Sequence, residues 1–321
     1  MKKCAFAGKK IGEQNMSYQS KKILITGGTG FIGKHLCDRL HQEGYGLYIL
    51  TRSQKTNMRM DHEKILYIND LSDIRNTHID IVINLAGETI AQRWTNKAKD
   101  EIYNSRIKTT QKLVQFITAQ QKPPELFISG SAVGYYGTNN NKIFTEENIP
   151  EPIDSEFATL LCHDWENEVS HLNDAGIRSV FLRIGPVLEK DGGMLAKLLP
   201  SFRLGLGTQI GDGKQWLSWI DRDDLIELIL YIIHQESIEG PVNATSPNPV
   251  TNEEFSFSLA KMLSRPCLLK TPEFVLKFIF GQMAEEIMIR GQKVLPQKAL
   301  SHGFQFSYPT LQQSLSKIFR S

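Results

Sequence analysis

A glycine-rich turn lies between an apolar run and an amphipathic segment close to the start of the chain. The run is Lys22–Thr26, and the turn that follows, Gly27–Gly33, reads Gly-Gly-Thr-Gly-Phe-Ile-Gly. Glycines in this pattern allow a tight strand-to-helix turn, let the backbone approach a diphosphate, and leave the helix N-terminus facing its charge. Because a strand and a helix flank the turn, it predicts a dinucleotide-binding unit rather than a chance glycine cluster. The residues expected at the diphosphate are Gly27, Gly30, Phe31, Ile32 and Gly33.

Short apolar runs alternate with longer segments of helical period, which is the pattern of a parallel sheet covered by helices. The runs are rich in Ile, Leu and Val, as strands buried on both faces require. We predict strands at Lys22–Thr26, Leu47–Arg52, Ile65–Ile68, Ile81–Leu85, Leu126–Ser129 and Ser179–Ile184. We predict helices at Phe31–Glu43, Lys97–Gln120, Ser155–Asp174, Asp221–His234 and Asn252–Leu263. The fold class is therefore α/β, a doubly wound parallel sheet of the Rossmann type with a smaller, mostly helical C-terminal lobe.

Three parts are expected along the chain. Residues 1–20 lack the apolar core of a secretory signal and read as a disordered extension. Residues 21–188 are predicted to form the Rossmann domain, to which later segments at about 218–245 return. Residues 189–321 are predicted to form a substrate lobe and a C-terminal domain.

Composition and charge exclude several classes of function. Basic and acidic residues nearly balance, 37 against 35, so no general attraction to nucleic acid or to an anionic membrane is expected. No window approaches the roughly 18 apolar residues of a membrane span. The four cysteines are scattered without a Cys-x-x-Cys pair, which predicts neither a disulfide framework nor a metal site. A reducing compartment fits best, and we expect a cytoplasmic protein.

The end of the second predicted strand decides between NAD and NADP. An Asp or Glu about 20 residues after the glycine turn bonds the ribose of NAD, but this chain has Thr51, Arg52 and Ser53 there. The guanidinium of Arg52 suits a 2′-phosphate, and Thr51 and Ser53 add hydroxyl donors. NADP(H) is therefore the favoured cofactor. The alternative is that Arg52 is a solvated strand-end residue and that both cofactors are accepted.

Two further strand ends are expected to line the cofactor. Asp70 follows the third strand, where folds of this kind commonly hold the adenine ring. The fourth strand ends in Leu85, Ala86, Gly87 and Glu88, and its small residues would let the backbone approach the ribose and the nicotinamide. The alternative for Ala86 and Gly87 is a plain strand-end turn.

Several motifs resemble those of one group of proteins. The segments Gly27–Gly33, Asn84–Glu88 and Ser129–Gly137 are similar to the extended and atypical short-chain dehydrogenases/reductases. More narrowly, the chain resembles the "epimerase family" proteins, usually described as nucleoside-diphosphate-sugar epimerases, at Gly87–Ala91, Arg93-Trp94, Ser105–Thr110, Phe202–Gly207, Gly213–Ile220 and Gly291–Phe306. The resemblance runs from about Lys22 to the end. It implies a Rossmann fold, NADP(H), a place for Arg106 at the cofactor and a C-terminal domain of undefined role, but no known substrate.

The catalytic residues of the short-chain dehydrogenases are only partly present. In that group a serine at the end of the fifth strand polarises the reacting oxygen, and a Tyr-x-x-x-Lys pair on the next helix supplies the base. Ser131 matches the serine, but the only Tyr-x-x-x-Lys in the chain, Tyr18 with Lys22, precedes the first strand. Using tyrosine as a base near neutral pH requires lowering its pKa by about three units, roughly 4 kcal/mol, which the lysine helps to supply. Hydride chemistry is therefore expected to be slow or to use other groups.

Substitutes for the missing pair lie near Ser131. Tyr135 or Tyr136 faces the nicotinamide if the loop turns back, and the alternative is that both pack structurally between the lobes. His163 and Asp164 on the following helix are a second acid–base candidate, for which surface positions are the simpler explanation.

The resemblance also implies contacts further along the chain. Gly185 and Pro186 belong to a strand-end loop that, in the family, passes beside the nicotinamide carboxamide. The positions at which extended epimerases grip a nucleotide-sugar diphosphate are held here by Arg203, Lys214, Trp216 and Trp219. Packing at a lobe interface explains Trp and Arg at such positions equally well.

Two functions are compatible with these residues. The first is an NADP(H)-dependent oxidoreductase or sugar-nucleotide epimerase acting on a small or nucleotide-linked substrate, with Ser131 and a nearby tyrosine in the chemistry. The second is a catalytically weak NADP(H)-binding sensor or scaffold that reports redox state to a partner. The missing pair favours the second, and the well-equipped cofactor site with its serine favours the first. By analogy with the fold, in which two long helices commonly form the contact, we also expect a homodimer.

Overall fold

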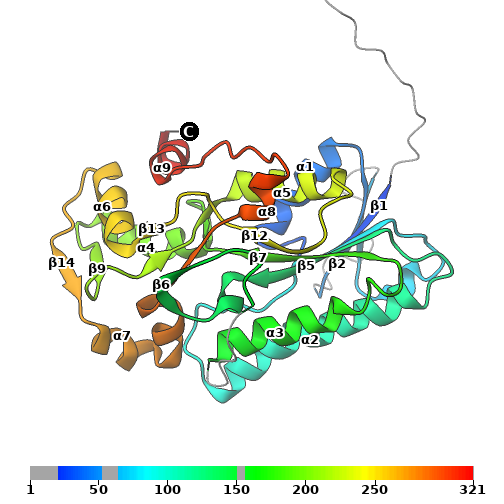
Figure 1. Cartoon of the computed structure of the whole chain (residues 1–321), viewed down its shortest axis with the longest axis horizontal. Coiled ribbons are helices and arrows are strands. Elements are labelled where there is room, and N and C mark those ends of the chain that lie inside the picture. Colours follow the sequence, from blue (N-terminus) through cyan, green and yellow to red (C-terminus); the bar gives the residue numbers. More distant parts are fainter. Residues whose placement is uncertain (1–20, 53–63, 150–155, 321) are drawn as a thin grey trace, which may run out of the picture.

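A seven-stranded sheet forms the centre of the molecule (Figure 1). The computed structural model describes residues 21–52, 64–149 and 156–320, so the predicted extension at 1–20 and Ser53 lie outside the described residues. The strand order is β12-β7-β5-β4-β1-β2-β3, and all neighbours are parallel. Because the order steps outward from β1 on both sides, the winding reverses between β1 and β4, as in a doubly wound Rossmann sheet. The predicted α/β fold class is confirmed.

The bounds of the elements follow the chain. The central strands are β1 (Lys22–Thr26), β2 (Gly46–Leu50), β3 (Ile65–Ile68), β4 (Ile81–Asn84), β5 (Leu126–Ala132), β7 (Arg178–Ile184) and β12 (Gly240–Ala244). Shorter strands are β6 (Asn139–Phe144), β8 (Val187–Leu188), β9 (Thr208–Ile210), β10 (Trp216–Leu217), β11 (Ile220–Asp221), β13 (Val250–Thr251), β14 (Leu269–Thr271) and β15 (Gln292–Val294). The helices are α1 (Gly33–Gln42), α2 (Asn96–Thr118), α3 (Phe157–Ser170), α4 (Gly193–Arg203), α5 (Arg222–His234), α6 (Asn252–Met262), α7 (Glu273–Phe280), α8 (Gln297–Ser301) and α9 (Leu311–Arg320). Short helical turns are η2 (Leu71–Ile74), η3 (Val133–Tyr136) and η4 (Ala284–Ile289).

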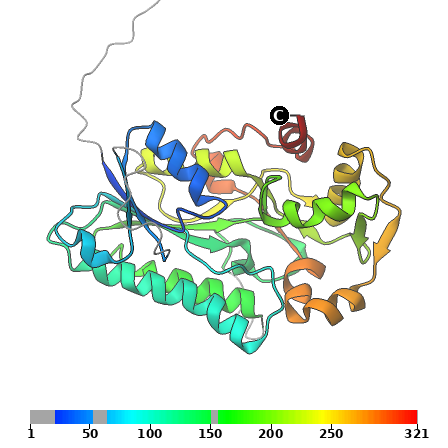
Figure 2. The same cartoon turned by 180° about the vertical axis from the view of Figure 1, so that it is seen from behind.

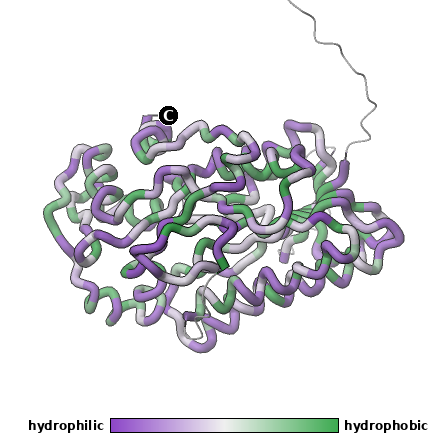
Figure 3. The backbone as a smooth tube through the Cα atoms, viewed as in Figure 1, coloured by the Kyte–Doolittle hydropathy of each residue, from purple (hydrophilic) through white to green (hydrophobic). Residues whose placement is uncertain are grey.

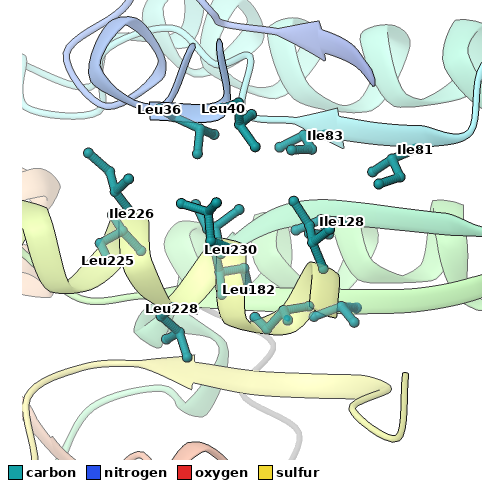
Figure 4. Packing of buried hydrophobic residues seen from close by; sticks show 14 of the residues in the cluster. Leu36, Leu40, Ile81, Ile83, Ile128, Leu182, Leu225, Ile226, Leu228 and Leu230 are labelled. Atoms are coloured by element: carbon teal, nitrogen blue, oxygen red, sulfur yellow. The ribbon is translucent and has the colours of Figure 1, made fainter. Parts of the chain in front are cut away.

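Both faces of the sheet are covered by helices, because successive strand residues point to opposite sides. In β1, Ile23 and Ile25 belong to the core beneath α1 and α5, whereas Leu24 belongs to the core beneath α2 and α3. Figure 4 shows side chains of α1 and α5 packed toward those of β4, β5 and β7. The tube in Figure 3 is mainly apolar along the central strands and carries polar stretches on the helices outside them.

The C-terminal third has its own small core but is also tied to the sheet. Helices α4, α6 and α9 meet around Phe202, Trp219 and Leu315, and Figure 2 shows α4, α6 and α7 gathered at one end of the molecule. Strand β15 pairs with β6, and Ala299 of α8 joins the core beneath β12. Strand β15 and helix α8 therefore contact the sheet part of the fold, β15 through the separate two-stranded sheet that it forms with β6 and α8 through the core.

The described residues contain no helix that is both long enough and apolar enough to cross a membrane.

Candidate functional site

A cavity of about 1250 Å³ opens along the ends of β1, β2, β4, β5 and β7. In a doubly wound sheet the ligand crevice lies at this edge, where the strand order reverses. A volume above the roughly 300–1,000 Å³ of one small-molecule site leaves room for a dinucleotide and a second small molecule. The predicted residues that line it are Gly27, Gly30, Phe31, Ile32, Gly33, Thr51, Arg52, Asp70, Leu85, Ala86, Gly87, Arg106, Ser131 and Gly185. Glu88 and Pro186 were predicted as well but are not among the lining residues.

The glycine turn is built so closely that side chains would not fit. Gly27 has a positive φ of 71°, and a Cβ there would lie 2.6 Å from the carbonyl oxygen of Leu85. A Cβ on Gly33 would lie 2.1 Å from the carbonyl oxygen of Gly27. Among the described residues no side chain caps α1, and its first turn carries no acidic residue. The N–H of Lys34 in that turn is bonded to the carbonyl oxygen of Gly30, so the start of α1 offers an anion its remaining N–H groups and the positive end of the helix dipole.

Arg52 stands at the far end of the cavity, after β2. Its side chain is 90% exposed, and its Nη2 lies 3.8 Å from Oε2 of Glu88. So exposed an ion pair is weak, and the guanidinium of Arg52 can leave it for a phosphate.

Asp70 caps η2 by accepting a hydrogen bond from the backbone N–H of Ser72 (2.8 Å). Hydrogen bonds from Ser72 lower the pKa of Asp70. Lys112, which the sequence analysis did not single out, adds an exposed cation at this end.

Ser131 begins a buried chain of hydrogen bonds. Its hydroxyl donates to Oε1 of Glu166 (2.6 Å), and Arg183 donates to both oxygens of that carboxylate, at 2.9 and 2.8 Å. Burial opposes the charge of Arg183, but the hydrogen bonds and charge of Glu166 raise its pKa above the usual value. Arg183 also donates to the hydroxyl of Tyr136 (2.9 Å), which donates to Oδ1 of Asn243 (2.8 Å). The serine in the cavity is thus coupled to an ion pair in the core.

The two tyrosines predicted as substitute bases do not line the cavity. Tyr136 is 2% exposed, and burial raises its pKa to about 12. The ring of Tyr135 stacks on that of His163 with centroids 4.2 Å apart and lies 3.4 Å from Cζ of Arg183, and burial raises its pKa as well. A phenol with a raised pKa is deprotonated more rarely near neutral pH, so it is less available as a catalytic base. The structure corrects the prediction of a tyrosine base in favour of structural packing, and leaves Ser131 as the predicted catalytic group in the cavity.

The residues predicted to hold a nucleotide sugar also lie away from the cavity lining. Trp219 is fully buried in the C-terminal core, and its Nε1 donates to a backbone oxygen (3.2 Å). Its ring has no free face for a ligand, so that prediction is corrected. Nζ of Lys293 covers the ring of Trp216 at 4.1 Å from its centroid. Arg203 and Lys214 are exposed on the C-terminal part.

Three side chains of α3 line the cavity although the sequence analysis did not select them: Leu161, Cys162 and Trp165. The Trp165 ring would lie 3.0 Å from a Cβ on Gly130, and its Nε1 donates to Oγ1 of Thr110 (3.0 Å). Burial raises the pKa of Cys162 to about 12, which keeps it a neutral thiol near neutral pH. The three share one face of a predicted helix, a spacing that could have identified them.

The sheet order, the glycine turn and the crevice at the reversal define a nucleotide-binding Rossmann protein. The chain belongs to the NAD dependent epimerase/dehydratase family, whose model matches residues 23–244, and residues 271–318 match a domain of unknown function. It is 39% identical to the epimerase family protein YfhF of Bacillus subtilis, over 92% of this chain and 97% of that one. It is 37% identical to the chloroplastic SDR39U1 homolog of Arabidopsis thaliana, over 93% and 86% respectively. The resemblance to the epimerase family is confirmed.

Solved structures show the same relationship. The human epimerase family protein SDR39U1 (isoform 2), crystallised with NADPH, superimposes with a TM-score of 0.83 at 30% identity, covering 94% of this chain and 99% of that one. A nucleoside-diphosphate sugar epimerase from Corynebacterium glutamicum gives 0.74 at 28% identity, covering 94% and 58%. The UDP-glucose 4-epimerase of Thermotoga maritima, at 19% identity and a TM-score of 0.74, shares the fold.

Proposed function

We propose that this protein binds NADP(H) and uses it in slow oxidoreductase or epimerase chemistry on a small or nucleotide-linked substrate. The observation that carries the proposal is the single cavity that joins the uncapped start of α1 to Arg52 at one end and Ser131 at the other. A dinucleotide lies across such a crevice with its diphosphate at the helix N-terminus. The human relative crystallised with NADPH supports the choice of cofactor.

The residues at the ribose end fit NADP(H) better than NAD(H). The lining at the end of β2 consists of Leu50, Thr51 and Arg52, with no carboxylate among them to accept from a ribose hydroxyl. Arg52 and the nearby Lys112 supply positive charge for a 2′-phosphate.

Replacing Arg52 tests the cofactor. Wild-type protein titrated by calorimetry is expected to bind NADPH on the order of tenfold or more tightly than NADH, since a charge-assisted hydrogen bond contributes about 1.5–3 kcal/mol. Arg52→Ala is expected to remove this preference by weakening NADPH alone. Arg75→Ala, an exposed arginine on the neighbouring η2 turn, is the matched control. Equal affinity of the wild type for both cofactors would count against the assignment.

The chemistry we propose centres on Ser131. The cofactor, when bound, would take a hydride as NADP⁺ from the carbon that bears a substrate hydroxyl, whose proton must leave at the same time, and as NADPH would return the hydride in the reverse direction. The hydroxyl of Ser131 donates to Glu166, so the serine oxygen is free to accept a hydrogen bond from a substrate hydroxyl. When the proton of the substrate hydroxyl moves to Ser131, the serine proton can move to Oε1 of Glu166. Arg183 holds the Glu166 carboxylate in place with two hydrogen bonds, and slow turnover is expected because the chain has no Tyr-x-x-x-Lys pair after β1.

Turnover tests this role. NADPH oxidation screened against carbonyl compounds and sugar nucleotides is expected to yield a substrate whose kcat falls by about 10²–10⁴-fold in Ser131→Ala. NADPH affinity should stay within a fewfold of the wild type, which separates loss of chemistry from misfolding. A variant as active as the wild type would remove Ser131 from the mechanism.

A catalytically weak NADP(H)-binding sensor is the second candidate. The buried, hydrogen-bonded hydroxyl of Tyr136 and the absence of a Tyr-x-x-x-Lys motif after β1 favour it. Saturable NADPH binding with no turnover across the whole screen would support this candidate over the enzyme.

The cellular setting we propose is the cytoplasm. Cys37, Cys162 and Cys267 are buried free thiols, which supports a reducing compartment.

A further inference from the structure

Arg106 of α2 is held as a rigid cation in the wall of the cavity. Its Nη1 donates to the backbone oxygens of Glu88 and Ile102, both at 3.1 Å. A Cβ on Gly87 would lie 2.8 Å from its Cζ and 2.9 Å from its Nη2, so the guanidinium lies flat against that glycine. Its Cζ also lies 5.3 Å from the ring centroid of Trp165. The groups that fix the side chain are two carbonyl oxygens, a glycine and an aromatic ring, none of which carries a negative charge.

No carboxylate in the described part of the chain forms an ion pair with Arg106. The acidic side chain that acts on its charge is Glu88, whose carboxylate lies beside Arg52 instead. Burial lowers the pKa of Arg106, which reflects the cost of holding the charge away from water. A partly buried cation without a counter-ion is unfavourable, and an anionic ligand in the cavity would relieve that cost.

The position of Arg106 separates it from the diphosphate turn. Arg106 lies against Gly87 and Glu88, which follow β4, and near Trp165 of α3, whereas the glycine turn lies between β1 and α1. In a doubly wound sheet the two halves of a dinucleotide lie on opposite sides of the reversal between β1 and β4. The adenine half has its own cations in Arg52 and Lys112, so Arg106 belongs to the half in which the substrate reacts.

We propose that Arg106 binds the carboxylate of the substrate, and that the substrate class is small 2-oxo acids or their 2-hydroxy counterparts. With Nη1 engaged by two backbone oxygens, Nε and Nη2 form the remaining edge of the guanidinium. This edge presents two parallel N–H donors, the arrangement that suits a bidentate carboxylate. Ser131 lines the same cavity and is the hydroxyl that we expect to meet the adjacent oxygen of such a compound. This inference rests on the proposed NADP(H) function and adds its substrate class.

Binding to the oxidised holoprotein tests the proposal without turnover. Protein saturated with NADP⁺ is titrated by calorimetry with pyruvate, 2-oxoglutarate and phenylpyruvate, and with hydroxyacetone as an uncharged analogue, up to about 10 mM, where weak binding is still measurable. At least one acid is expected to bind and hydroxyacetone is not. Arg106→Gln is expected to weaken the acid on the order of tenfold to a hundredfold, with NADP⁺ affinity changed less than about threefold. Arg106→Lys should restore part of the loss, since it keeps the charge without the planar fork.

Arg75→Gln, which removes one exposed positive charge outside the cavity, is the matched control and should bind the acid as the wild type does.

Three outcomes overturn the inference. None of the acids binds the NADP⁺-loaded wild type, acid binding survives Arg106→Gln, or Arg106→Gln loses affinity for NADP⁺ instead, which would assign Arg106 to the phosphates of the cofactor. The two proposals fail distinguishably. Absence of NADP⁺ binding by the wild type overturns both, whereas NADP⁺ binding without acid binding overturns this one alone.

Discussion

At the scale of single residues, the ion pair between Glu166 and Arg183 holds the site together. Both side chains are almost fully buried, at 7% and 4% exposure, and they make two hydrogen bonds to each other. Such a pair adds little stability compared with apolar residues of the same volume, but removing one partner leaves an uncompensated charge in the core. Since Ser131 is bonded to the same carboxylate, the pair also sets the orientation of the predicted catalytic hydroxyl.

Glu166→Leu is expected to lower the free energy of unfolding by about 3–5 kcal/mol, because Arg183 would stay buried without its counter-ion. Urea denaturation followed by circular dichroism measures this loss. Asn167→Ala, one residue further along α3 at an exposed position, is the control and should change stability by no more than about 0.5 kcal/mol. Similar losses in the two variants would show that the pair does not contribute as described.

The residues at the glycine turn could be predicted from the sequence, whereas those around Ser131 could not. Gly27 and Gly33 are required by a local turn, and the turn is visible in seven consecutive letters. Ser131, Glu166 and Arg183 come from three elements, β5, α3 and β7, and only the packing of α3 on the sheet brings them together. The same packing turns Tyr135 and Tyr136 away from the cavity, which no local pattern indicates.

At the scale of elements, the segments with strong periodicity were predicted within a few residues. The helix predicted at Lys97–Gln120 is α2, Asn96–Thr118, and the strand predicted at Leu126–Ser129 is the start of β5. Strand β12 and the shorter strands were not predicted. Strand β12 (Gly240–Ala244) contains Gly, Pro and Asn, which are typical of turns, and most of the others have only two or three residues, too few for a periodic signal. Their pairing is also distant, since β15 pairs with β6 about 150 residues away along the chain.

Helix α5 links the sheet to the C-terminal segment through a buried carboxylate. Asp224 accepts hydrogen bonds from the backbone N–H groups of Ser307 (2.8 Å) and Tyr308 (3.0 Å). Burial nevertheless dominates and raises its pKa to about 6. Between about pH 4 and pH 6 the folded protein therefore retains a proton that the unfolded chain has released, and this group makes stability fall as the pH rises through that window.

Asp224→Asn removes this titration. Relative to the wild type, the variant is expected to become more stable as the pH rises from about 4 to 6, and the difference between the two free energies of unfolding should shift on the order of 3 kcal/mol at most. Urea denaturation at several pH values measures the shift. A difference that stays constant across the window would contradict burial as the cause.

At the scale of the whole molecule, the C-terminal third and the nucleotide cavity are parts of one packed structure. A Cβ on Gly192, just before α4, would lie 2.2 Å from the ring of Phe31 in the glycine turn, so the loop that opens the C-terminal part touches the cofactor site. Lys317 of α9 forms ion pairs with Glu189 and Asp221 at 2.9 and 3.1 Å. A single sequence could indicate that these parts exist, but not that they share contacts, because each contact joins residues far apart along the chain.

Leu315→Ala, in the last helix α9, tests whether the C-terminal third and the nucleotide cavity unfold together. Leu315 is 1% exposed in the C-terminal core, so its truncation is expected to cost about 2–5 kcal/mol. Because the parts are packed together, tryptophan fluorescence and circular dichroism should report one shared transition that moves to lower temperature.

NADPH at about 100 times its Kd should add about 2.7 kcal/mol to the free energy of unfolding of both proteins and move that same transition to higher temperature, since the ligand binds the folded state alone. Gln312→Ala, exposed on the same helix, should leave the transition in place. Two transitions, with NADPH moving only one and Leu315→Ala only the other, would show instead that the C-terminal part folds independently of the cofactor site.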